Sequence, residues 1–148
     1  MDHRGEELKR FFSHDGVAIK GWLGCGRQLA VITARDSTAT ERRFSELGVK
    51  YIYTGVKDKA KIFETILNAV EMEPSQAAMV GDDLPDLPVL RKCGYAVAVS
   101  NAVEEVKALA HYVTTLPGGH GAVREVVEQL LKAQGRWDDV VSMYDSTS

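Results

Sequence analysis

Short apolar runs alternate with helical patterns through most of the chain, and this alternation limits the possible folds more than any other feature. Runs typical of strands occupy residues 29–32, 49–53, 77–80, 95–99 and 112–114, and the run 49–53 alternates like a half-buried strand. Segments with helical spacing of apolar residues follow them at 37–47, 59–70, 87–92, 102–110 and 123–134. Strands that alternate with helices form βαβ units and a parallel sheet. We therefore predict an α/β fold, a three-layer Rossmann-like parallel sheet with helices on both faces.

The length and composition indicate one globular domain, which we assign to residues 1–148. Apolar residues make up 45% of the chain and the net charge is −3, which argues against a nucleic-acid partner. No apolar run approaches the ~20 residues that span a bilayer, and the charged start is unlike a signal peptide. Cys25 and Cys93 lack metal or redox spacing, so we expect buried, reduced thiols in a cytoplasmic protein.

An acidic cluster follows the apolar run 77–80 directly. Asp82, Asp83 and Asp86 lie within five residues, and Pro85 suits the first turn of the next helix. Carboxylates at the carboxyl end of a parallel strand face the crevice where open α/β sheets bind ligands. Because close carboxylates repel one another, a cation between them is expected, and Mg²⁺ prefers oxygen ligands and also binds phosphate. The alternative is a turn whose aspartates cap the helix.

Polar side chains also follow two earlier strands of the predicted sheet. Thr33 and Arg35 come after the run 29–32, and Lys59 opens the helix after 49–53. In a parallel sheet these loops emerge at the same edge as the acidic cluster, so a hydroxyl, two cations and the acids would share one rim. A hydroxyl and an ammonium can both bind phosphate oxygens. Alternatively, Thr33 forms a local turn or cap, Arg35 pairs with a nearby acid, and Lys59 is a solvated surface lysine.

With these residues in this order, the sequence resembles the haloacid-dehalogenase-like phosphatases. Within them it is similar to the branch that acts on 3-deoxy-D-manno-octulosonate 8-phosphate and to its sialic-acid-pathway relatives. Thr33 matches the hydroxyl of the second family motif, Lys59 the lysine of the third, and residues 81–86 the metal-binding fourth. The run Gly-Gly-His-Gly-Ala-Val-Arg-Glu at 118–125 is similar to a signature of this branch. The resemblance covers nearly the whole chain and implies a domain without a large cap domain.

The resemblance implies a Mg²⁺-dependent phosphatase for a small phosphorylated sugar acid, with a place in lipopolysaccharide biosynthesis. Family members transfer the phosphoryl group to an aspartate and then hydrolyse the aspartyl phosphate. Thr33 and Lys59 would hold the phosphoryl oxygens, and Arg35 is the candidate for the substrate carboxylate.

The same resemblance assigns the acidic cluster and the glycine-rich run. Asp82 would bind Mg²⁺, with Asp83 and Asp86 positioning the waters of the metal or Lys59. Residues 118–121 would form a mobile loop near the rim.

One departure from the family lies at the start of the chain. Family members begin with a strand ending in Asp-x-Asp-Gly, which supplies the nucleophile and the general acid/base, and this sequence has no such motif. Two hypotheses follow: a phosphatase in shortened form that is weakly active or inactive, or a non-catalytic binding or oligomerisation domain derived from the family. In the resembled fold that strand lies between those ending at Thr33 and Val80. We therefore expect two unpaired strand edges unless the sheet closes or another segment fills the gap.

The two ends of the chain predict self-association. A strand or arm at 6–12 precedes a predicted helix at 15–23 and has no neighbouring strand to pair with, which favours pairing between subunits. A second short helix or tail at 136–144 is too apolar for a free end, so it should dock on a surface. In the resembled branch the arm and the tail reach neighbouring subunits, which implies a homotetramer. The alternative is that the tail packs on its own domain.

Overall fold

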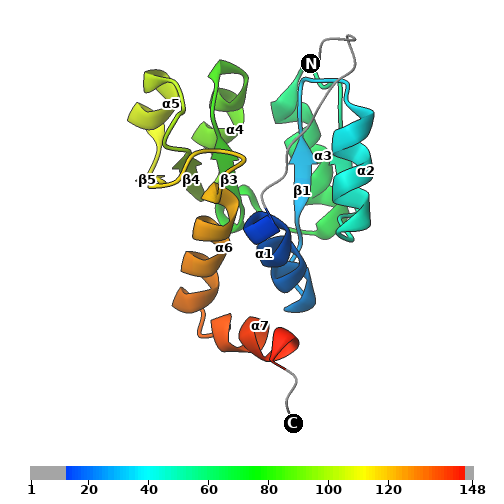
Figure 1. Cartoon of the computed structure of the whole chain (residues 1–148). Helices are drawn as coiled ribbons and strands as arrows, with labels where there is room; N and C mark the ends of the chain where they lie inside the picture. The colour runs from blue at the N-terminus through cyan, green and yellow to red at the C-terminus, as the bar shows by residue number, and fades with distance from the viewer. Residues whose placement is uncertain (1–12, 146–148) are drawn as a thin grey trace, which may run out of the picture.

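The computed structural model describes residues 13–145, and the predicted helices and strands are confirmed in order and type (Figure 1). The strands are β1 Ala30–Ile32, β2 Tyr51–Tyr53, β3 Ala78–Gly81, β4 Tyr95–Ala98 and β5 Tyr112–Val113. The helices are α1 Ser13–Gly24, α2 Thr38–Glu46, α3 Lys59–Val70, α4 Leu87–Lys92, α5 Glu104–Leu109, α6 Ala122–Ala133 and α7 Trp137–Tyr144. Two short 3₁₀ turns complete the list, η1 Pro74–Gln76 and η2 Leu84–Asp86. The predicted arm at 6–12 lies outside the described residues.

All five strands are paired in parallel, but within residues 13–145 they form two sheets rather than one continuous sheet. One sheet pairs β1 with β2, and the other has the order β3-β4-β5. Figure 1 shows β1 with α2 and α3 on one side, and β3, β4 and β5 with α4 and α5 on the other. The α/β class is confirmed, whereas the described strands do not close the predicted gap between β1 and β3.

The backbone hydrogen bonds show which residues of β1 and β3 direct their N–H and C=O groups to the edge between the two sheets. Successive residues of a strand direct their N–H and C=O groups to opposite sides. The Thr33 N–H donates to Tyr53 O at 3.0 Å, so the next residue back, Ile32, directs its groups away from β2. Val99 N–H donates to Gly81 O at 3.2 Å, so Val80 directs its groups away from β4. Across residues 13–145, therefore, the inner edges of both sheets offer backbone groups for a further strand.

Within residues 13–145, three apolar clusters hold the helices and strands together. The largest joins β3 and β4 to the helices α3, α4 and α5, with Val89, Leu90 and Val106 almost fully buried. A second packs Ile19 of α1 against Leu47 and Val49 beside β1. The third packs α1, α6 and α7. No helix within residues 13–145 is long and apolar enough to cross a membrane.

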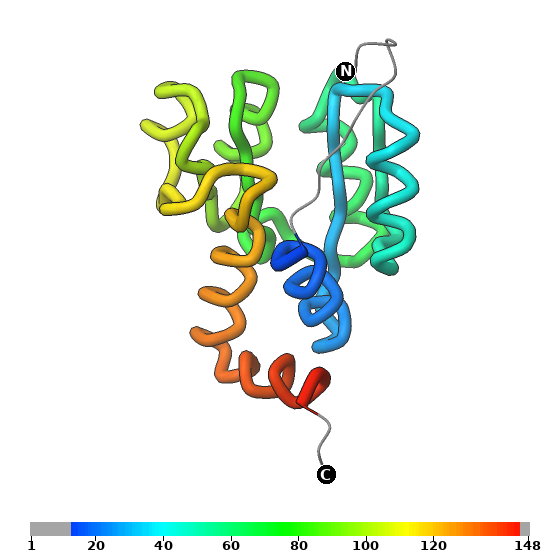
Figure 2. The backbone as a smooth tube through the Cα atoms, viewed as in Figure 1, coloured from blue at the N-terminus to red at the C-terminus, as the bar shows by residue number. Residues whose placement is uncertain are grey.

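Helix α7 packs on its own domain, as the alternative interpretation of the tail predicted. Figure 2 shows it at the far end of α6, and it contacts α1 as well. Val140 is 2% exposed and lies over Gly21, where a Cβ atom would stand only 2.6 Å from Val140 Cγ1. The outer residues Val141, Met143 and Tyr144 remain exposed. Own-domain packing therefore leaves an apolar strip on α7 in contact with solvent.

Candidate active site

The turn after β3 folds the acidic cluster back on itself. Asp86 is 3% exposed, and its Oδ2 accepts the backbone N–H groups of Asp82 at 2.9 Å and Asp83 at 3.2 Å. Pro85 lies at the start of η2, where its missing N–H costs nothing. Gly81 permits this close approach, because a Cβ there would lie 2.9 Å from the Asp86 Cβ. The turn thus buries one carboxylate and leaves the other two toward solvent.

A buried ion pair joins the two halves of the fold. Lys59, the first residue of α3, donates from Nζ to Asp86 Oδ1 at 2.6 Å. Both side chains are shielded, with 11% of Lys59 and 4% of Asp86 exposed, so the interpretation of Lys59 as a solvated surface lysine is wrong. Burial by itself would raise the pKa of Asp86, but the hydrogen bonds from Lys59, Asp82 and Asp83 outweigh it and lower that pKa. Asp86 therefore stays ionised and fixes the Lys59 ammonium at the rim.

The other two carboxylates have separate environments. Partial desolvation and the neighbouring Asp86 raise the pKa of Asp82, although its side chain still reaches solvent. Asp83 is exposed and accepts the Leu84 N–H at 2.8 Å, which is the capping role that the alternative interpretation gave to part of the cluster. Within residues 13–145 no three His, Cys, Asp or Glu side chains are grouped to hold a metal ion. Of the two exposed carboxylates, Asp83 caps the turn and Asp82 does not, so Asp82 is the better placed to bind a ligand.

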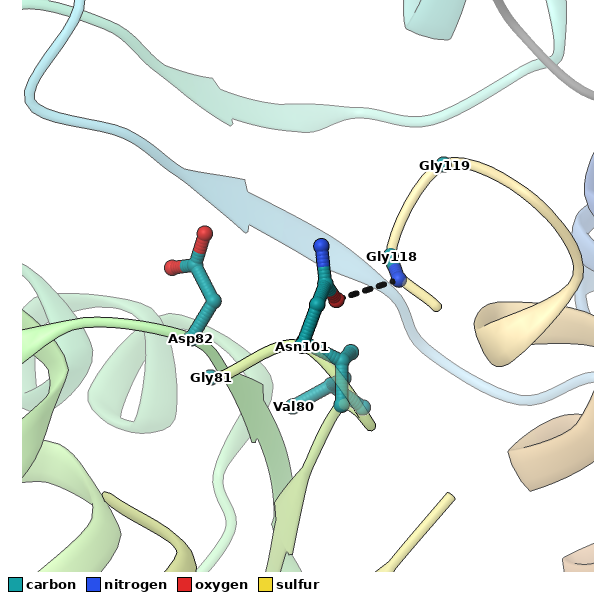
Figure 3. Close-up of a pocket in the computed structure, with 7 residues that line it drawn as sticks. Val80, Gly81, Asp82, Asn101, Gly118 and Gly119 are labelled. Carbon is teal, nitrogen blue, oxygen red and sulfur yellow. Dashed lines mark hydrogen bonds between the residues drawn. The ribbon is translucent and has the colours of Figure 1, made fainter. Parts of the chain in front are cut away.

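A cavity of about 240 Å³ lies beside Asp82, between the ends of β3 and β4 and the glycine-rich loop (Figure 3). Gly118 of this loop donates its N–H to Asn101 Oδ1 at 3.0 Å. The lining residues are Val80, Gly81, Asp82, Val99, Asn101, Gly118 and Gly119. Sequence reasoning placed Asp82 and the loop at one rim but missed Asn101. The available signal was its position, because Asn101 directly follows the buried run 95–99 at the same edge of the sheet.

Thr33 and Arg35 lie at the rim in a separate turn. Thr33 Oγ1 accepts the Arg35 N–H at 3.2 Å, so the interpretation of Thr33 as a local turn former is confirmed. Arg35 is exposed, and its backbone oxygen accepts the N–H of Gly55 at 3.0 Å. Neither residue lines the cavity beside Asp82. The ligand-binding roles of both remain predictions.

The start of α6 is capped by a residue from the far end of the chain. Asp15 of α1 is 8% exposed, and its carboxylate accepts the N–H groups of Gly121 at 3.2 Å and Arg124 at 2.9 Å. These N–H groups are among those that a helix leaves unpaired at its first turn. Gly121 has φ 110°, a conformation that glycine adopts without strain. Asp15 therefore anchors the carboxyl end of the loop whose middle residues, Gly118 and Gly119, line the cavity.

Glu125 holds the amino end of the same loop. Its carboxylate accepts the backbone N–H groups of Thr115 and Leu116 at 2.9–3.0 Å and the Tyr112 hydroxyl at 2.5 Å. Partial burial would raise the pKa of Glu125, but the hydrogen bonds from Tyr112, Thr115 and Leu116 lower it. The same bond to Glu125 raises the pKa of Tyr112. The segment 115–121 is thus fastened to α1 at one end and to α6 at the other.

The parallel α/β fold and the rim of Lys59, Asp86 and Asp82 are those of the haloacid dehalogenase-like class of proteins. Residues 32–126 match the haloacid dehalogenase-like hydrolase family, and the chain belongs to that family.

Individual relatives narrow the similarity. The chain is 42% identical over 139 residues to 3-deoxy-D-manno-octulosonate 8-phosphate phosphatase of Escherichia coli K12, covering 94% of this chain and 74% of that protein. It is also similar to the Moraxella catarrhalis phosphatase of the same name, which was crystallised with magnesium, phosphate and the sugar acid. That match has a TM-score of 0.92 and 38% identity, and it covers 97% of this chain and 83% of the Moraxella chain. The cobalt-bound Haemophilus influenzae phosphatase matches with TM-score 0.86 and 36% identity, covering 91% of this chain and 76% of that one.

Proposed function

We propose that this chain carries the phosphate and metal side of a Mg²⁺-dependent phosphatase for a small sugar-acid phosphate such as 3-deoxy-D-manno-octulosonate 8-phosphate. The observation that carries the proposal is the buried Lys59–Asp86 pair beside the open carboxylate of Asp82. The fixed ammonium of Lys59 offers a positive charge to a phosphoryl oxygen, and the Thr33 hydroxyl offers a hydrogen bond. Arg35, exposed in the next turn, is suited to the carboxylate of the sugar acid.

Mg²⁺ would be held by Asp82, with waters and the ligand phosphate completing its shell. The raised pKa of Asp82 supports this proposal, because a carboxylate crowded by another carboxylate gains from a cation. The bound metal would neutralise charge on the transferring group. Asp83 and the buried Asp86 are suited to orienting metal-bound waters and Lys59, respectively.

Calorimetric titration with Mg²⁺ tests the metal assignment. Asp82→Asn should weaken binding, whereas Asp138→Asn, the same change at an exposed position on α7, should leave it unchanged. Equal metal affinity for wild type and Asp82→Asn would contradict the assignment of Asp82.

Catalytic turnover by the 148-residue chain should be no more than trace, since the sequence lacks the Asp-x-Asp of the family. Asp15 is a poor substitute nucleophile, because both of its oxygens are occupied by the start of α6. The test is phosphate release from octulosonate 8-phosphate by purified protein, with Lys59→Met as the control for a contaminating enzyme. Rapid turnover that Lys59→Met abolishes would show that another residue of this chain acts as the nucleophile.

The second candidate function is a non-catalytic binding or oligomerisation domain. The open inner edges of β1 and β3 favour it, because an added strand could pair with both sheets.

Homotetramer formation is a further proposal, supported by the exposed apolar residues of α7. Light scattering coupled to size exclusion tests it: Tyr144→Glu should reduce the mass of the assembly, and the exposed control Ser142→Glu should not. A wild-type mass equal to the 16.3 kDa monomer at micromolar concentration would contradict the tetramer.

A further inference from the structure

Asn101 lies in a turn that hydrogen bonds from its neighbouring residues hold in place. Ala102 N–H closes the turn by donating to Val99 O at 3.0 Å, and Val103 N–H donates to Asp82 O at 3.0 Å. Ser100 N–H donates to Oγ1 of the buried Thr114 at 3.1 Å. The residues on both sides of Asn101 are therefore hydrogen-bonded to the ends of β3 and β4 and to Thr114, which directly follows β5.

The orientation of the Asn101 amide follows from its partner. A backbone N–H can only donate, so the Asn101 atom that accepts from Gly118 is Oδ1. The Nδ2 atom of the same amide is therefore not engaged with Gly118. Figure 3 shows this nitrogen directed away from Gly118, on the side to which the Asp82 carboxylate also projects. Asn101 is exposed, so Nδ2 is accessible to a ligand at the cavity.

The cavity lining makes this donor distinctive. Among the seven lining residues, three are glycines, two are valines and one is Asp82, which leaves Asn101 as the one lining side chain with N–H groups to donate. A ligand that places a sugar oxygen here would find an apolar wall, a carboxylate and one neutral side-chain donor. Neutral donors recognise hydroxyl, carboxylate and phosphoryl oxygens without adding charge.

We propose that Asn101 is a ligand-recognition residue, whose Nδ2 donates a hydrogen bond to an acceptor oxygen of the bound sugar-acid phosphate. Its Oδ1 holds the Gly118 loop at the same time, so one side chain both binds the ligand and sets the position of the loop beside it. This inference rests on the proposed function and deepens it, because it assigns a specificity contact for the polar part of the substrate.

Two substitutions separate the two roles of the side chain. Asn101→Asp keeps an oxygen that can accept from Gly118 N–H but replaces the donor with a negative charge. Asn101→Ala removes both groups. Asn68→Asp is the matched control, since Asn68 is exposed and lies nine residues along α3 from the rim, about 13 Å at the helical rise.

Binding to the 148-residue chain is measured calorimetrically with Mg²⁺ present, using 3-deoxy-D-manno-octulosonate and inorganic phosphate as separate probes. Asn101→Asp should weaken at least one probe by roughly tenfold or more, the equivalent of losing one hydrogen bond and adding repulsion of an anion. A loss confined to the sugar acid would identify its oxygens as the acceptors, and a loss confined to phosphate would identify the phosphoryl oxygens. Asn68→Asp should bind both probes like wild type.

Hydrogen exchange at the Gly118 amide, followed by NMR, supplies the readout for folding and for the loop. The amide should be protected in wild type and in Asn101→Asp, and should exchange faster in Asn101→Ala. If wild type binds and Asn101→Asp binds equally well with Gly118 still protected, the recognition role of Asn101 is overturned while the proposed function stands. If wild type binds neither probe, the proposed function fails as well.

Discussion

The buried pair of Lys59 and Asp86 makes the sharpest stability prediction. Asp86→Ala removes a carboxylate that is 3% exposed and that accepts from Lys59 Nζ at 2.6 Å and from the N–H groups of Asp82 and Asp83. It leaves a shielded ammonium and two backbone donors without this acceptor. We expect a loss of about 3–5 kcal/mol in the free energy of unfolding, the range found when one partner of a buried ion pair is removed.

Lys59→Met should cost less, because the Asp86 carboxylate keeps its two backbone donors. The loss of one charge-assisted hydrogen bond predicts about 1.5–3 kcal/mol. In the double variant no buried charge remains unpaired, so its destabilisation should fall short of the sum of the single variants by at least about 1 kcal/mol.

Urea unfolding followed by far-UV circular dichroism measures these quantities, since the transition midpoint and slope together give the free energy. Asp139→Ala is the control, because it removes the partner of an exposed ion pair with Arg136 and should leave the midpoint near wild type. Additive effects of Lys59→Met and Asp86→Ala, within about 0.5 kcal/mol, would refute the reasoning that the two residues form one coupled pair.

Two further predictions concern the loop above the cavity. Asp15→Ala should destabilise the chain by about 1–2 kcal/mol through loss of the α6 cap, and Asp15→Asn by less since its amide oxygen still accepts; urea unfolding checks both. The pKa of Glu125 is held below its ordinary value of 4.5, so its contribution to stability is complete above that pH and is lost as the pH falls through the lower folded-state value. Glu125→Gln should therefore destabilise near neutral pH and make unfolding less sensitive to acid between pH 4.5 and the folded-state pKa; an unchanged pH profile of the unfolding midpoint would contradict this.

Local patterns were sufficient to predict the helices and strands of this chain. The limits of α3 and α4 agree with prediction because capping residues and helical periodicity act over a few neighbouring positions. Asp58, for example, caps α3 by accepting the Lys61 N–H, and the next residue is the Lys59 of the rim. The parallel pairing of the strands also followed from their alternation with helices.

The spacing of the three aspartates in the acidic cluster does not predict their different structural roles. The family resemblance set Asp82 apart as the metal ligand, and the folded turn further distinguishes the buried Asp86, which holds Lys59, from Asp83, which caps the turn. That distinction arises because Gly81 lets the Asp86 side chain pack under the turn, where Lys59 from a different βα unit meets it. A contact between residues 27 positions apart leaves no periodic trace in the sequence.

The sequence by itself determined the fold class and the order of the helices and strands, because hydrophobic period, turn chemistry and strand direction are local properties. Only the tertiary structure decided that the described strands form two sheets, that Asp15 caps a helix more than a hundred residues away, and that Asn101 fastens the loop beside Asp82. Those features depend on contacts between segments that are far apart in the sequence. The packing and hydrogen bonds that stabilise such contacts are properties of the folded chain as a whole, and local sequence patterns do not reveal them.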